Sequence, residues 1–226
     1  MIDKLREIHK YGRLFEFEYS IDIEYGALNS FIIDSKSLIN SKGKELENKI
    51  EQWKTELLSY NDAPEPFEMY ETDIIEFNQF SSLLNNSFFI MSYSIFERYL
   101  FEICVYSQQE EGVEKSVKDI NEKSYIDQCR KYLVEIIEVD LANIQAEWAE
   151  IKKYQKIRNA VAHNHGVLKT RDENLINFIN INKSIKIDEL TLTVAIELIS
   201  FISDFTNLTK EYISKLLKEI DGQKRK

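Results

Sequence analysis

Residues 84–101 of this 226-residue chain read LNNSFFIMSYSIFERYLF, an apolar stretch interrupted by serines and by one adjacent pair of charged residues. Apolar side chains recur every three or four positions through this stretch and before it, at Tyr70, Ile74, Phe77, Phe80, Leu84, Phe88, Met91, Ile95 and Tyr99. This spacing keeps one face of a helix apolar, and after Phe88 apolar residues spread to other faces. The sequence therefore predicts a long central helix that is buried on several sides.

The rest of the chain favours helices as well. Glycine and proline together number only eight, and Pro64 and Pro66 mark the end of an amphipathic helix expected over about residues 27–60. Further helices are expected after a cap at Ser124 and over residues 144–162, 173–179 and 190–219. We therefore predict an all-α fold, an up-and-down bundle of long helices.

Two segments alternate apolar and polar residues instead, which is the period of a half-buried strand. They are residues 15–25, FEFEYSIDIEY, and residues 184–188, SIKID. The two segments could pair as a small β-ribbon within the bundle. A continuous helix through residues 15–25 is the alternative.

Composition limits the classes of function. A formal net charge of −10 opposes nonspecific attraction to nucleic acid over the whole surface. Cys104 and Cys129 match no zinc-ligand spacing, and the chain contains no HExxH, Walker or GxSxG motif. The first residues lack the order of a signal peptide and no apolar run is long enough to span a membrane, so we expect a cytoplasmic protein with no membrane partner.

One motif stands out, KIRNAVAHNHG at residues 156–166, which holds two of the three histidines. It lies within residues 151–171, a window that has six basic residues and no Asp or Glu. On a helix, Asn159 and His163 stack on one face. Arg158 lies about 140° from His163 and about 7.5 Å along the axis. A site that uses both needs either the reach of the arginine or a second chain.

Two interpretations of this motif are open. A cation near the terminal carbonyls and a glycine at Gly166 are ordinary features of a helix C-terminus. The same residue types also suit RNA cleavage by internal attack, which needs a base for the 2′-hydroxyl, an acid for the leaving 5′-oxygen and positive charge on the phosphate. Histidine can be either acid or base, and arginine supplies fixed donors to phosphate oxygens.

The pattern Arg158-Asn159-x-x-x-His163 near a helix end resembles the RNxxxH signature of the HEPN superfamily, the higher eukaryotes and prokaryotes nucleotide-binding domain. The segment FIMSYSIFERYL at residues 89–100 is similar to the first core helix of that family. The resemblance covers roughly residues 70–218. It implies a HEPN-like helical bundle domain over residues 67–226 and an N-terminal helical extension, residues 1–66, packed on it.

The resemblance also implies a function. Many HEPN proteins are homodimeric, metal-independent endoribonucleases of toxin–antitoxin or phage-defence systems, with a composite site at the dimer interface; others are inactive binding modules. Carried onto this chain, His163 is the general base or acid, Arg158 stabilises the transition state and Asn159 orients His163. The second protomer supplies the complementary histidine. We therefore expect an RNA substrate, an antitoxin partner and neither a metal ion nor a cofactor.

Other residues are assigned from the same motif. Candidates for binding RNA are Lys152, Lys156, His165 and Lys169, although a plain exposed histidine is the alternative for His165. Glu97 either pairs with Arg158 across the bundle or is solvated. The aromatic residues Tyr70, Phe77, Phe80, Phe88 and Phe89 are expected in the core rather than as stacking platforms for bases. A non-catalytic nucleotide- or RNA-binding module and a helical dimerisation protein remain alternative functions.

Overall fold

The computed structural model describes residues 2–57 and 66–223 of the chain. Six α-helices account for most of the described residues, together with two short strands and two 3-10 helices, η1 (Val117–Asp119) and η2 (Ala142–Ile144). The helices are α1 (Ile2–Leu57), α2 (Pro66–Glu111), α3 (Tyr125–Glu135), α4 (Gln145–His163), α5 (Glu173–Ile181) and α6 (Ser200–Gln223), and the strands are β1 (Ile185–Asp188) and β2 (Thr193–Ile196). The predicted fold class, a bundle of long helices, is confirmed.

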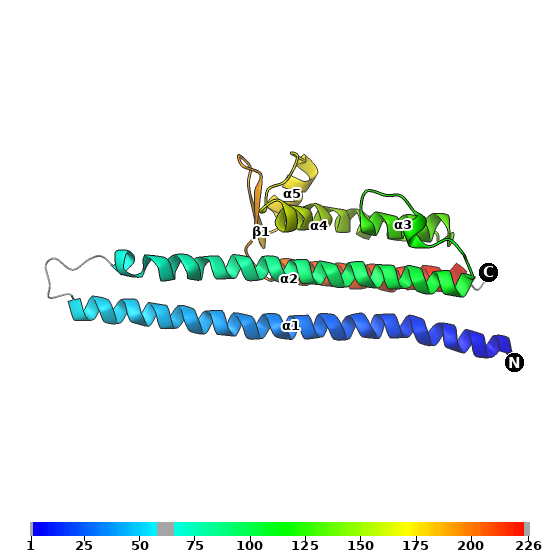
Figure 1. Cartoon of the computed structure of the whole chain (residues 1–226), viewed down its shortest axis with the longest axis horizontal. Helices are drawn as coiled ribbons and strands as arrows, with labels where there is room; N and C mark the ends of the chain where they lie inside the picture. The colour runs from blue at the N-terminus through cyan, green and yellow to red at the C-terminus, as the bar shows by residue number, and fades with distance from the viewer. Residues whose placement is uncertain (1, 58–65, 224–226) are drawn as a thin grey trace.

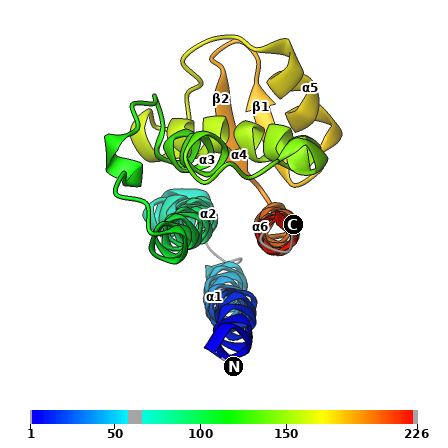
Figure 2. The same cartoon turned by 90° about the vertical axis from the view of Figure 1, so that its right-hand side faces the viewer.

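The four long helices run in alternating directions along the molecule, in the order α1, α2, α4 and α6 (Figure 1). Viewed along its length, α1 lies on one side, α2 and α6 cover it, and α3 and α4 form the next layer (Figure 2). Helix α5 and the two strands lie outermost, beside the C-terminal end of α4. The bundle therefore places α4 between the central helix α2 and the hairpin.

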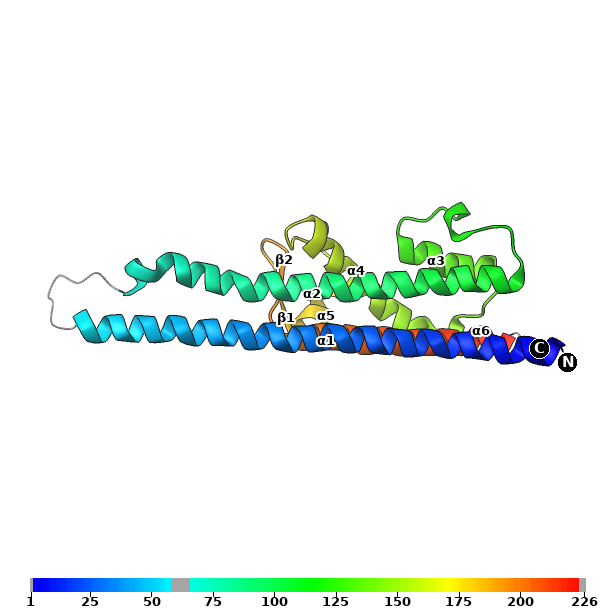
Figure 3. The ribbon, with the colours of Figure 1, turned by 60° about the horizontal axis from the view of Figure 1, so that its bottom comes forward.

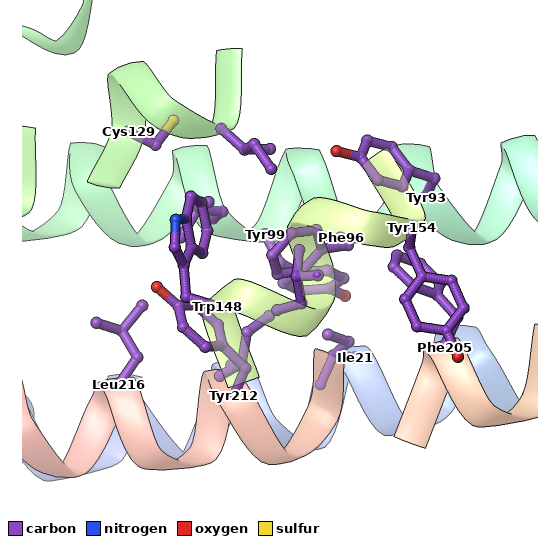
Figure 4. Close-up of a cluster of buried hydrophobic side chains, with 14 of the residues drawn as sticks. Ile21, Tyr93, Phe96, Tyr99, Cys129, Trp148, Tyr154, Phe205, Tyr212 and Leu216 are labelled. Carbon is purple, nitrogen blue, oxygen red and sulfur yellow. The ribbon is translucent and has the colours of Figure 1, made fainter. Parts of the chain in front are cut away.

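Aromatic side chains fill the core where α2, α4 and α6 meet (Figure 4). The Tyr93 ring on α2 stacks on Phe205 of α6 with centroids 5.5 Å apart, and Tyr154 of α4 lies 5.1 Å from the same phenylalanine. All three side chains are buried. Phe88 and Phe89 are buried as predicted, whereas the prediction is wrong for Phe80, whose side chain is 43% exposed.

The predicted strand at residues 15–25 is wrong, because this segment is part of α1. Ile21 and Tyr25 are buried, whereas Tyr19 and Ile23 are 58% and 54% exposed. Alternation places an apolar residue at every second position, and every fourth position also falls on one face of a helix. One half of the alternating residues therefore packs on α2 and α6, and the other half faces solvent.

The second strand prediction holds, with a different partner. β1 pairs antiparallel with β2, and Ile185 lies opposite Ile196. The helix predicted from Leu190 is therefore wrong before Ser200. The segment TLTVAI at residues 191–196 is rich in β-branched residues, which favour a strand, and the Asp188 carboxylate accepts the N–H groups of Leu190 and Thr191 in the turn.

Helix α1 packs against both α2 and α6, and its residues Ile21, Tyr25, Leu28 and Ile32 belong to the common core. Its first 32 residues thus lie along the bundle, and the remainder extends beyond it together with the start of α2 (Figure 3). The domain boundary at residue 66 stays a prediction. Within the described residues, no helix is long and apolar enough to cross a membrane.

Candidate active site at the end of helix α4

The motif KIRNAVAHNHG occupies the last turns of α4 and the loop that follows. Gly166 closes the helix as predicted, since its N–H and that of Asn164 both donate to the carbonyl of Ala160, at 2.9 and 3.0 Å. Gly166 has φ +84°, and His165 also lies in the left-handed region with φ +52°. The helix end is therefore a tight reversal that turns the chain back immediately after His163.

Strand β2 holds this reversal in place. The N–H of Val194 donates to the carbonyl of Gly166 at 2.9 Å, and the N–H of Leu168 donates to the carbonyl of Leu192 at 3.0 Å. A β-carbon on Gly166 would lie 2.9 Å from the carbonyl oxygen of Val194, so this close approach requires glycine. The hairpin that positions the site was absent from the sequence prediction, because residues 190–199 were assigned to the last helix.

Arg158 and His163 meet within one chain. Nη1 of Arg158 lies 3.3 Å from Nε2 of His163 and 3.1 Å from Oδ1 of Asn159. Of the two ways to overcome the angle between Arg158 and His163, the reach of the arginine is the one realised. Because a guanidinium has only donors, Nε2 can enter this contact only as the acceptor, which requires the imidazole tautomer with its proton on Nδ1.

Asn159 contacts the arginine rather than the histidine. Within the described residues, its carboxamide oxygen accepts from Arg158 and no hydrogen bond joins it to His163. The expected role of Asn159 in orienting His163 would therefore act through the guanidinium that both side chains contact.

Glu97 and Tyr93 hold the guanidinium from the central helix α2. The carboxylate of Glu97 accepts from Nη2 of Arg158 at 3.4 Å, which realises the pairing alternative for Glu97, and both side chains are only about one fifth exposed. Burial raises the pKa of Glu97, and the nearby Arg158 opposes this increase. The guanidinium carbon lies 5.2 Å from the centroid of the buried Tyr93 ring, in a cation–π contact that the sequence reasoning missed.

A cavity of about 320 Å³ opens beside the imidazole. Its lining includes Lys156, Asn159, His163, Lys169, Asp172 and Leu175. Two of the four residues predicted to bind RNA, Lys156 and Lys169, thus lie on the same cavity as His163. The other two, Lys152 and His165, do not line it.

The basic window of the sequence is largely neutralised by carboxylates from other elements. Lys152 pairs with Asp127 of α3 at 2.6 Å, and Lys156 pairs with Asp172, the residue that caps α5. The lysine lowers the pKa of Asp172 through its hydrogen bond. An acid-free stretch of sequence is therefore not an acid-free surface.

The remaining cations of the window divide into two groups. Arg171 pairs with Glu173 and Glu189, and Lys153 lies over the ring of Phe178 with Nζ 5.0 Å from its centroid. The side chain of Lys169 is exposed and makes no ion pair or hydrogen bond with the described residues. Lys169 is therefore the cation of this cavity that is available to a phosphate.

The described residues contain no group of three or more His, Cys, Asp or Glu side chains that could hold a metal ion. Cys104 and Cys129 are both buried, and the Cys104 thiol donates to the carbonyl of Cys129 at 3.5 Å. No protein-family model, curated protein or solved structure matches this chain.

Proposed function

We propose that this protein is an endoribonuclease that cleaves RNA through attack of a 2′-hydroxyl on the adjacent phosphate, with no metal ion in the reaction. The observation that carries the proposal is the 3.3 Å contact between Arg158 Nη1 and Nε2 of His163, a residue that lines the cavity. A permanent cation and an imidazole supply two of the three components that this reaction needs, the positive charge and the base.

The contact suggests how the two side chains act in sequence. The single lone pair of His163 Nε2 faces Arg158, so the guanidinium has to leave it before the imidazole can act as the base for the 2′-hydroxyl. A phosphate oxygen that accepts from Arg158 would draw the guanidinium away and free Nε2 to take the proton of the 2′-hydroxyl, and the resulting imidazolium can no longer accept from Arg158. Arg158 then stays at the phosphate oxygens, where negative charge develops as the 2′-oxygen attacks phosphorus.

The leaving 5′-oxygen needs a proton from a second acid. Following the HEPN resemblance, we propose that the histidine of a second protomer supplies it in a homodimer, and that the reaction serves a toxin–antitoxin or phage-defence system. The arginine need not come from the second chain, because Arg158 reaches His163 in its own.

The test is to incubate the purified protein with a transfer RNA pool in EDTA and to identify the product ends. We expect cleavage that leaves 2′,3′-cyclic phosphates, and its loss in His163→Gln, which keeps a hydrogen-bonding side chain but cannot accept a proton at neutral pH. Lys186→Ala is the control, because this exposed lysine pairs with Glu197 on the hairpin, away from the cavity. Cleavage that persists in His163→Gln would refute the proposal.

One observation favours a second candidate, a non-catalytic nucleotide-binding module. Four of the six cations of the basic window already face carboxylates, which leaves a small positive area rather than a broad footprint for RNA. Binding of a single nucleotide in the 320 Å³ cavity, measured by calorimetry and weakened by Lys169→Ala, would support this candidate if no RNA is cleaved.

A further inference from the structure

Helices α1 and α2 extend together beyond the rest of the fold, to the left in Figures 1 and 3. We call residues 33–57 of α1 and 66–83 of α2 the arm. Its seam is a short antiparallel coiled coil, with Ile39, Gly43, Leu46, Ile50 and Trp53 of α1 facing Tyr70, Ile74 and Phe77 of α2. A β-carbon on Gly43 would lie 2.7 Å from the Phe77 ring, which fixes the relative height of the two helices.

The arm does not bury its own apolar residues. Over residues 33–56 and 68–83, no side chain is buried, and even the seam residues are only half-buried. Two helices alone cannot enclose a core, and a third or fourth element is needed to cover the seam. The arm therefore resembles two helices of a four-helix bundle whose other two helices are missing.

Four exposed apolar side chains of helices α1 and α2 lie on one flank of the helix pair. Phe31, Leu38, Phe80 and Leu83 are 54%, 61%, 43% and 60% exposed. Leu38 is five residues from Gly43, and Leu83 is six residues from Phe77 in the opposite chain direction, so the two leucines lie at similar heights. The Phe31 ring of α1 contacts the Phe88 ring of α2, and Lys42 of α1 lies over the Phe80 ring of α2. Both contacts join α1 to α2.

Helix α6 lies on the other flank. Lys210 of α6 pairs with Asp22 of α1 at 2.7 Å, and a groove between the same helices is lined by Gly26 and Asn29. These residues of α1 lie on the face toward α6, and Ile33, four residues after Asn29, continues the same face. The flank that carries Leu38 and Leu83 is therefore the one that α6 leaves free.

Charges on this free flank differ between the two helices. From residue 66 to residue 97, α2 has acidic residues and no Lys or Arg, whereas α1 has five lysines between residues 33 and 57. A groove on the flank places Lys42, Glu45 and Lys49 of α1 beside Asp73 and Glu76 of α2, and Lys49 pairs with Glu45 at 3.0 Å. The α2 side of this groove thus carries only acids, whereas the α1 side carries two lysines and one glutamate.

We propose that the arm binds the arm of a second copy of this chain, flank to flank, and forms a four-helix bundle. When a two-fold axis runs along the arms, α1 of each copy faces α2 of its partner at the same height. Lys42 and Lys49 of one copy then lie beside the acidic residues of α2 in the other. Leu38 of each copy faces Leu83 of its partner at the centre of the interface. Arms that point in opposite directions would instead place α1 against α1 and the acidic α2 against α2.

The size of the flank fits this partner. About 25 residues at 1.5 Å each and two helices of about 10 Å diameter give a footprint on the order of 700 Å². This is close to the roughly 800 Å² per partner of a stable protein interface. No arm residue lies in the cavity beside His163, so association through the arm can be measured apart from cleavage.

Sedimentation analysis over about 1–100 µM tests the proposal, and we expect a dimer of the full chain. Leu38→Glu with Leu83→Glu should weaken it at least about 100-fold, because charges would be buried at the centre of the interface. Ile33→Glu is the matched control, an equally exposed apolar residue of α1 on the flank that faces α6. Circular dichroism checks that each variant is as helical as the wild type.

A charge exchange tests the arrangement of the two copies. One variant carries Asp73→Lys and Glu76→Lys, and the other carries Lys42→Glu and Lys49→Glu. Each should be monomeric alone, and an equimolar mixture should form a heterodimer, because lysines then face acids on both sides. A monomeric wild type, or a dimer unaffected by Leu38→Glu with Leu83→Glu, would overturn the proposal; the latter would place the interface elsewhere, such as at the composite site.

Discussion

Arg158 and His163 lie five residues apart on one helix, and the Arg158 side chain extends along α4 so that Nη1 lies 3.3 Å from Nε2 of the imidazole. The arginine keeps this position because three other groups hold it: the Glu97 carboxylate, the Asn159 carboxamide and the face of the Tyr93 ring. Two of these come from α2, so the pairing on α4 depends on the packing of one helix against another.

Arg158→Lys should reduce the proposed RNA cleavage by about 100-fold, the usual effect of losing one donor to a developing oxyanion. A lysine keeps the charge, but it lacks the planar fork that contacts Glu97, Asn159 and His163 together. The measurement is the rate of cleavage of saturating RNA. Arg171→Lys is the matched control, because Arg171 pairs with Glu173 and Glu189 outside the cavity, and an equal loss in both variants would contradict the assigned role.

Glu97→Gln should leave the free energy of unfolding at pH 7 unchanged or higher. Burial raises the pKa of Glu97 despite the nearby Arg158, so the folded protein favours the protonated carboxyl more than the unfolded chain does. Stability linked to this group is greatest below its ordinary pKa and is lost as the pH rises through the raised value. Urea unfolding from pH 4 to pH 8 should show the variant and the wild type converging in acid.

In the same variant, RNA cleavage should fall, because Arg158 loses the carboxylate that holds it. A variant that is less stable than the wild type at pH 7 would instead show that the ion pair outweighs the burial of the two charges.

Gly166→Ala should lower the free energy of unfolding by about 1–3 kcal/mol, because the residue has a left-handed backbone and its β-carbon would press on the carbonyl of Val194. Gly26→Ala is the opposite case, a glycine inside α1 with nothing within 4 Å of the added carbon. This variant should be more stable by up to about 1 kcal/mol. Urea denaturation of both variants measures the contrast, and equal effects would argue against strain at Gly166.

Asp172→Ala should cost about 1–2 kcal/mol, because the Asp172 carboxylate accepts the N–H groups of Asn174 and Leu175 at the start of α5. Asp172→Asn keeps the cap and loses the pairing with Lys156, so it should cost less than about 1 kcal/mol. Lys156 lowers the pKa of Asp172, so the contribution of the ion pair is present above the ordinary pKa of Asp172 and disappears as the pH falls through the lowered value. Thermal unfolding at pH 7 and in acid separates the two contributions.

Apolar residues that recur every three or four positions over long segments predicted most of the helices. Residues 190–199 are a place where this pattern gave the wrong structure. Val194 and Leu198 continue the apolar stripe of the last helix, but three of the four residues of β2, Thr193, Val194 and Ile196, are β-branched, and the strand pairs with β1. Residues 15–25 failed in the opposite sense, because alternation with period two contains the four-residue spacing of a helix. In both cases the local pattern fitted two structures, and packing against neighbouring elements selected one.

The sequence by itself determined the helical class, the end of α4 at Gly166 and the grouping of Arg158, Asn159 and His163, because these depend on residues close together in the chain. Only the tertiary structure decided which charges remain available. Asp127, Asp172 and Glu97 reach the basic window from other elements, up to 61 residues away in sequence, and neutralise most of it. Electrostatic interaction depends on distance in space, and the folded chain alone sets that distance.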